Sequence, residues 1–183
     1  VDRIHSWLAD YLNAECTDDN ADYLREISSA WIKGLVARIL YPGCKRDDVL
    51  ILQGHQGWFK STAVKVLADA IHPNSFTDDI PDLKGEEVKY AIRGMIVVEF
   101  AELASINRSE IETIKSFISR TSDHVRDKYA KHPNDYPRTV SFIGTTNDEA
   151  FLKDPTGNRR WWPVKITRPI DVGKLEAVVG QLI

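Results

Sequence analysis

The sequence of 183 residues has few cysteines, little net charge and no long apolar run. Its two cysteines, Cys16 and Cys44, cannot build a disulfide framework, which favours a reducing, cytoplasmic compartment. The 24 basic and 27 acidic residues give a net charge of −3, which excludes the small basic proteins that coat nucleic acids. No stretch approaches the roughly 18 apolar residues of a membrane span, so no membrane partner is expected. The five histidines lack metal-ligand spacing, which argues against a metal held by protein ligands alone.

The apolar residues that are present alternate between helical and strand-like patterns. Residues 1–40 have helical periodicity with a polar break at 17–20. The patterns predict buried strands at 48–53, 95–98, 139–144 and 161–166, and helices at 60–72 and from a capping box that starts at Ser109. This alternation predicts an α/β fold with a mainly parallel sheet flanked by helices.

Three segments follow from this pattern. They are a small helical subdomain at 1–45, a core at 46–168, and the start of a truncated helical segment at 169–183. Because the chain begins at Val1 and ends within an expected helix, we expect it to be a piece of a longer protein.

A glycine-containing loop lies between the first predicted strand and its helix. Gly54, Lys60 and Ser61 occupy the positions required by the phosphate-loop pattern G-x-x-x-x-G-K-[ST], which brings backbone N–H groups, a lysine and a Mg²⁺-binding hydroxyl to phosphates. The candidate nucleotide-binding residues are Gly54, His55, Gln56, Gly57, Trp58, Phe59, Lys60, Ser61 and Thr62. Phe59 replaces the glycine before the lysine, and its side chain costs about 1–2 kcal/mol if the backbone is left-handed. The alternative is an ordinary strand–helix turn with a surface lysine.

Two glutamates follow the second predicted strand. A nucleotide hydrolase needs an acid at the end of a neighbouring strand to hold Mg²⁺ and to polarise the attacking water. We expect Glu99 to order Mg²⁺ through water, together with Ser61. We expect Glu102 to be the catalytic base, because it lies beyond the strand end. The alternative is a solvated strand end, where glutamate is common.

Polar residues also follow the third predicted strand, at Thr145-Thr146-Asn147. A side chain at this point can hydrogen-bond a γ-phosphate or the attacking water, and Asn147 is the candidate. A simple turn would use the same residue types.

Residues 123–138 contain two short extended pieces around a polar turn, which predicts a hairpin. Basic and aromatic side chains are interleaved in it, a mixture suited to gripping a phosphate backbone and stacking bases. The candidate DNA-binding residues are Arg126, Lys128, Tyr129, Lys131 and Arg138. A solvated loop is the alternative, because three aspartates dilute the positive charge.

Two adjacent arginines, Arg159 and Arg160, lie on a turn before the fourth predicted strand. An arginine supplied to a neighbouring subunit's γ-phosphate makes hydrolysis depend on assembly. We expect the pair to enter an extended segment, where adjacent side chains point to opposite faces, so that only one reaches a phosphate. Arg160 is slightly favoured. The alternative is a structural pair that stacks on Trp161 and Trp162.

Taken in order, these segments resemble the virulence-associated protein E family, which phages and pathogenicity islands carry, and the superfamily 3 helicases of the AAA+ ATPases. The resemblance rests on residues 42–45, 54–62, 96–103, 112–119, 136–138, 142–147 and 152–164. It implies an AAA+-type P-loop fold. The implied roles are Walker A for Lys60 and Ser61, Walker B for Glu99 and Glu102, sensor 1 for Asn147, a DNA-contacting loop for the hairpin, and an arginine finger for Arg159 or Arg160. Phe59 and the spacing of the two glutamates depart from the usual pattern.

The function that this resemblance implies is an ATP- and Mg²⁺-dependent DNA helicase or translocase of a phage or mobile-element replication protein, in the cytoplasm of a bacterial host. Its implied partners are single-stranded or forked DNA, further copies in a hexameric ring, and a fused or associated primase. One alternative is a non-catalytic DNA-binding or scaffold protein with a degenerate loop, which Phe59 favours. Another is a P-loop kinase, although the sequence marks no acceptor pocket.

Overall fold

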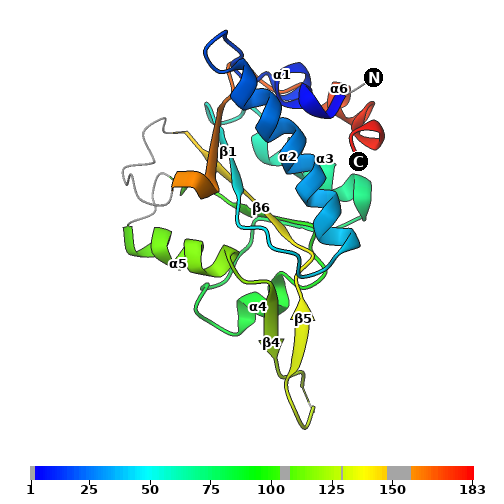
Figure 1. Cartoon of the computed structure of the whole chain (residues 1–183), viewed down its shortest axis with the longest axis vertical. Helices are drawn as coiled ribbons and strands as arrows, with labels where there is room; N and C mark the ends of the chain where they lie inside the picture. Colours follow the sequence, from blue (N-terminus) through cyan, green and yellow to red (C-terminus); the bar gives the residue numbers. More distant parts are fainter. Residues whose placement is uncertain (1–2, 104–107, 129, 148–157) are drawn as a thin grey trace.

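The computed structural model describes residues 3–103, 108–128, 130–147 and 158–183, and Figure 1 shows their arrangement. The helices are α1 (Trp7–Leu12), α2 (Ala21–Leu40), α3 (Lys60–Ile71), α4 (Glu87–Ala91), α5 (Arg108–Ile118) and α6 (Val172–Glu176). The strands are β1 (Val49–Gln53), β2 (Phe76–Thr77), β3 (Val97–Phe100), β4 (Ser122–Val125), β5 (Asn134–Pro137), β6 (Ser141–Thr146) and β7 (Trp161–Lys165). Short 3₁₀ turns lie at Arg3–His5, Asn158–Arg160 and Val179–Gln181.

Five strands form one parallel sheet in the order β2-β3-β6-β1-β7. The predicted α/β class and parallel sheet are therefore confirmed. Each of the four predicted strands is present, but β6 begins and ends two residues later than the pattern 139–144 indicates. The sequence interpretation missed β2 and α4, which are only 2 and 5 residues long.

Two separate apolar clusters cover the two faces of the sheet, because successive residues of a strand point to opposite faces. Leu50, Leu52 and Ile143 pack with α1, α2 and α3 in one cluster. Val49, Ile51 and Phe142 pack with α4 and α5 in the other. The strands are thus buried on both sides, which explains their continuous apolar runs.

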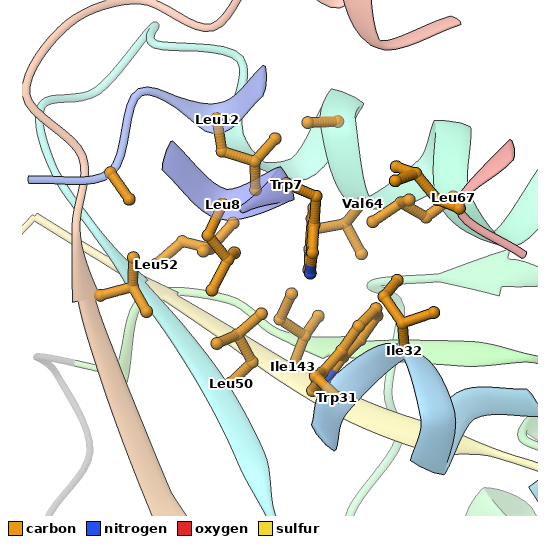
Figure 2. Close-up of a cluster of buried hydrophobic side chains, with 14 of the residues drawn as sticks. Trp7, Leu8, Leu12, Trp31, Ile32, Leu50, Leu52, Val64, Leu67 and Ile143 are labelled. Carbon is orange, nitrogen blue, oxygen red and sulfur yellow. The ribbon is translucent and has the colours of Figure 1, made fainter. Parts of the chain in front are cut away.

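The first cluster contains two fully buried tryptophans at its centre (Figure 2). The ring centroids of Trp7 and Trp31 lie 5.7 Å apart, and the indole N–H of Trp7 donates to the carbonyl oxygen of Ser28 at 2.9 Å. The predicted N-terminal helices therefore share one apolar core with the sheet. Residues 13–15 also join the edge of β7, where the N–H of Glu15 donates to the carbonyl oxygen of Lys165 at 2.7 Å.

The start of α5 differs from the capping box predicted at Ser109. An N-cap residue lies outside the helix, whereas Arg108 is already helical here. The carbonyl oxygen of Ser109 instead accepts a hydrogen bond from the hydroxyl of Thr113 at 3.0 Å. Ser109 is therefore a helical residue.

Strands β4 and β5 form an antiparallel hairpin that projects away from the sheet (Figure 1). The hairpin predicted at 123–138 is confirmed. It precedes β6, so its base lies near the amino-terminal edge of the sheet, opposite the edge where β1, β3 and β6 end. In the described part of the chain, no helix combines the length and apolarity needed to cross a bilayer.

Candidate functional site

A cavity of about 540 Å³ lies at the carboxyl-terminal edge of the sheet, where β1, β3 and β6 end. Its walls come from three segments that are distant in sequence but adjacent in the sheet. The lining residues are Gln56, Gly57, Trp58, Phe59, Lys60, Ser61, Thr62, Ala101, Glu102, Thr145, Thr146 and Asn147. Three of the predicted motifs therefore meet around one space.

The loop after β1 requires unusual backbone geometry. A Cβ on Gly54 would lie 3.1 Å from the carbonyl oxygen of Ile166, so glycine permits this close approach, and Gly57 has a φ of +80°. Phe59 has φ 60° and ψ 25°, which is the left-handed region, and its side chain is 54 % exposed. The position that normally carries glycine thus keeps the glycine-like backbone with a phenylalanine in place, at a cost of about 1–2 kcal/mol.

Two other loop residues hold the loop against the core. The rings of His55 and Trp58 meet edge to face with centroids 4.7 Å apart. Trp58 packs against the first apolar cluster, and its carbonyl oxygen accepts the N–H of Ile170 at 3.2 Å. The loop is therefore anchored on its outer side.

Lys60 begins α3 and bends back over the loop. Its ammonium donates to the carbonyl oxygens of Gly54 at 2.6 Å and His55 at 2.8 Å, and it contacts the side-chain oxygen of Asn147 at 3.3 Å. Burial lowers the pKa of Lys60, while the nearby Glu99 carboxylate opposes this effect. The contact joins the predicted lysine to the predicted sensor residue.

Glu99 is fully buried at the end of β3. Its Oε1 accepts hydrogen bonds from Ser61 Oγ at 2.8 Å and from Thr145 Oγ1 at 2.5 Å. Burial raises the pKa of Glu99, although the hydrogen bonds from Thr145 and Ser61 act in the opposite direction. Its Oε2 has no hydrogen-bond partner within the described residues. The predicted pair of Mg²⁺ ligands, Ser61 and Glu99, is therefore in direct contact.

The second glutamate has a different environment. Glu102 lies on the cavity wall, is exposed, and has a left-handed φ of 53°. Non-glycine residues in this conformation are strained and cluster at functional sites. Phe59 and Glu102 both line the cavity, whereas the other two such residues in the described chain are asparagines, which tolerate the conformation.

Thr145 is a site residue to which the sequence interpretation assigned no role. The strand was expected to stop at Gly144, and among the polar residues after it Asn147 was the candidate, with a simple turn as the alternative. In the structure β6 continues through Thr146, and the Thr145 side chain reaches the carboxylate of the adjacent strand. The sequence signal that could have indicated this role is the position of a polar residue directly after a predicted central strand.

The candidate DNA-binding residues of the hairpin separate into two groups. Arg126, Lys128 and Lys131 are exposed, and Tyr129 lies outside the described residues. Arg138 is buried: its guanidinium donates to Asp123 at 2.6 and 2.7 Å and to the carbonyl oxygen of Phe117 at 2.6 Å. All its nitrogens are thus engaged, so Arg138 fixes the base of the hairpin instead of contacting DNA as expected.

The two arginines at the start of β7 also differ from each other. They form a 3₁₀ turn, so the expected extended segment with opposed side chains is wrong. Arg160 Nε donates to Asp47 Oδ2 at 3.1 Å, whereas Arg159 is exposed. Trp161 of β7 pairs with Val49, which begins β1, so the pair lies at the edge opposite the cavity.

The residues at the cavity fit a nucleotide with Mg²⁺. Lys60 supplies a positive charge at the mouth of the loop, and the Ser61 hydroxyl and the Glu99 carboxylate supply oxygen ligands. The unpaired, buried Oε2 of Glu99 is a polar atom that a bound cation and its water would satisfy.

Comparisons with known proteins show a family and a similar fold. The family model "Virulence-associated protein E-like domain" matches residues 1–183. No curated protein sequence matches significantly. Apo structures of the NrS-1 C-terminal region (305–718) are similar, with TM-scores of 0.58 and 0.57 and identities of 18 % and 17 %. They cover 88 % and 87 % of this chain, which spans only 42 % and 40 % of theirs.

Proposed function

Because the chain belongs to the family of virulence-associated protein E-like domains, we propose that it is an AAA+-type P-loop ATPase domain of a phage or mobile-element replication protein. In this role it binds and hydrolyses ATP and drives movement along single-stranded or forked DNA. We further propose that it works in a homo-oligomeric ring, hexameric in the simplest form, with a fused or associated primase.

The observation that carries the proposal is the contact between Ser61 and Glu99 beside Lys60. Three groups that phosphate and Mg²⁺ chemistry requires come from two separate segments, Lys60 and Ser61 from the start of α3 and Glu99 from β3, and meet at the carboxyl edge of a parallel sheet. Ligands of open α/β sheets bind at this edge. An ordinary turn with a surface lysine would not bury the lysine to 8 % exposure or place a buried acid against the next residue.

Each residue then has a defined task. ATP bound with Mg²⁺ supplies the phosphoanhydride that reacts with water. Lys60 neutralises phosphate charge, and Ser61 with Glu99 holds the metal. Glu102, exposed on the cavity wall, accepts the proton of the attacking water. Asn147, already in contact with Lys60, orients that water or senses the terminal phosphate.

The test is ATP hydrolysis by the whole chain with and without oligo-dT. Lys60→Ala should abolish hydrolysis, while Lys65→Ala should retain it. Lys65 is the matched control because it is an exposed lysine of the same helix outside the cavity. Equal turnover in the two variants, with both folded, would remove the phosphate-loop assignment.

A second function is favoured by one observation, the left-handed Phe59. A strained phenylalanine in place of the glycine before the lysine is what a degenerate phosphate loop in a DNA-binding or scaffold protein would contain. In that case oligo-dT binds to the chain, and ATP analogues neither bind nor change that binding.

A further inference from the structure

The hairpin is attached to α4 and the residues just after it by contacts from three side chains, those of Lys89, Tyr90 and Arg93. Tyr90 donates its hydroxyl hydrogen to the carbonyl oxygen of Arg126 at 2.6 Å. Lys89 donates to the carbonyl oxygen of His124 at 3.0 Å. Arg93, just after α4, contacts the side chains of Asp127, which follows β4, and of Tyr136 in β5, whereas Lys89 and Tyr90 contact backbone carbonyl oxygens.

Arg93, Asp127 and Tyr136 form a closed group, here called the Arg93 cluster. The guanidinium lies over the Tyr136 ring, 3.6 Å from its centroid, and its Nη1 contacts Asp127 Oδ1 at 2.8 Å. The hydroxyl of Tyr136 donates to the other oxygen, Asp127 Oδ2. These two hydrogen bonds, from Tyr136 first and then Arg93, lower the pKa of Asp127.

The cluster is open to solvent. The side chains of Arg93 and Asp127 are 42 % and 34 % exposed. An ion pair in such a setting contributes little to stability and is screened by salt. The carboxylate presents two oxygens to an arginine and a hydroxyl, which is how the two non-bridging oxygens of a phosphodiester are recognised.

The surroundings of the cluster favour an anionic ligand. The exposed cations Arg126, Lys128 and Lys131 lie on the same hairpin. Lys89 forms an ion pair with Glu86 at 2.7 Å, and the His124 ring hydrogen-bonds Asp135 at 2.8 Å.

We propose that Arg93 and Tyr136 form a binding site for the backbone phosphate of single-stranded DNA, and that Asp127 occupies this site until DNA displaces it. The proposal rests on the DNA-binding part of the proposed function and adds two residues, one of them outside the hairpin. Asp127 then acts as an internal competitor that weakens binding. The ring of Tyr136, over which the guanidinium lies, holds it in position for the incoming phosphate.

The experiment measures the affinity of fluorescein-labelled oligo-dT for the whole chain by anisotropy, at about 50 and about 200 mM salt. Arg93→Gln should weaken binding about fivefold and reduce the slope of log K against log salt by about 0.7, the value for one lost phosphate contact on a single strand. Asp127→Asn should tighten binding by a similar factor, because the competitor loses its charge. In the double variant, Asp127→Asn should have no effect, since the site it masks is gone.

Glu86→Gln is the matched control, since it removes the same charge next to α4 without touching the cluster. Equal tightening by Glu86→Gln and Asp127→Asn would overturn the proposal in favour of a general charge effect. If neither Arg93→Gln nor Asp127→Asn changes the affinity for oligo-dT, the proposal is also overturned, but the proposed function is unaffected. If the wild type and all variants fail to bind oligo-dT, both the proposal and the DNA-binding role are overturned. The Lys60-dependent ATP hydrolysis is tested separately and does not depend on this result. Thermal unfolding of each variant confirms that it is folded.

Discussion

Replacement of Arg138 by methionine should destabilise the protein strongly, because this arginine is the buried partner of Asp123. The two side chains are 1 % and 6 % exposed, and the guanidinium also stacks on Phe117, 4.3 Å from the ring centroid. Methionine keeps most of the apolar volume but leaves the Asp123 carboxylate buried without its counter-charge. Removing one partner of a buried ion pair costs about 3–5 kcal/mol, a large part of the 5–15 kcal/mol that usually stabilises a domain.

The assay is urea unfolding followed by tryptophan fluorescence, since Trp7 and Trp31 are fully buried reporters. Arg120→Met is the control: Arg120 is exposed and lies over the same Phe117 ring, at 5.4 Å from its centroid. Its loss should change the free energy of unfolding by no more than about 0.5 kcal/mol. Arg138→Met combined with Asp123→Leu should recover most of the loss, because apolar residues can replace a buried ion pair without net cost.

Equal stability of Arg138→Met and Arg120→Met would refute this reasoning. If Arg138→Met also lost affinity for oligo-dT, that result would support the DNA contact that was expected for Arg138 from the sequence. Hydrogen exchange of the β4 and β5 amides separates global destabilisation from local opening of the hairpin.

Three further predictions concern the cavity and the hairpin. Glu99→Gln should stabilise the nucleotide-free protein at neutral pH and abolish Mg²⁺-dependent ATP-analogue binding. Burial raises the pKa of Glu99, so the free energy of unfolding of the wild type should fall as pH rises from about 4.5 through that raised value. The same fall with pH in Glu99→Gln as in the wild type would contradict this reasoning. Phe59→Gly should raise the free energy of unfolding in urea by about 1–2 kcal/mol, because it relieves the left-handed strain, whereas Phe59→Ala, which keeps the strain and removes only the ring, should not. Weaker ATP-analogue binding by both variants would show that the ring itself contacts nucleotide. Neutralising Lys128 and Lys131 together should reduce the slope of log K for oligo-dT against log salt by about 1.4, and an unchanged slope would indicate a solvated loop.

The sequence was sufficient for the elements that have strong local signals. The helix after the phosphate loop begins at Lys60, and β1 follows its apolar run, because both patterns reflect burial of the same residues. The left-handed backbone at Phe59 could also be expected, since the loop pattern requires glycine there. Short elements such as β2 could not be predicted, because 2 residues carry no periodicity and their pairing depends on β3.

Side-chain partners that are distant in the sequence also could not be predicted. Arg138 looks like one more basic residue of the hairpin, and only the fold shows that Asp123 of β4 and the end of α5 surround it. Likewise Asp47 precedes β1 by two residues, yet it faces Arg160 because β1 and β7 pair in parallel. The role of a basic residue therefore depends on which acidic side chain the fold places next to it, and the local sequence does not show this.

The parallel register also constrains how the arginine pair acts in the proposed ATPase. Val49 pairs with Trp161 and Gln53 with Lys165, so four residues of strand, about 13 Å, separate the level of Trp161, which directly follows Arg160, from the level of Gln53, where β1 ends. Arg160 is further directed away from the cavity by its ion pair with Asp47. Neither arginine is placed to serve the cavity of its own chain, so in the proposed ring either one could act only at the cavity of a second copy. Arg159, exposed and not used in that ion pair, is then the better candidate of the two, which reverses the slight preference drawn from an extended backbone.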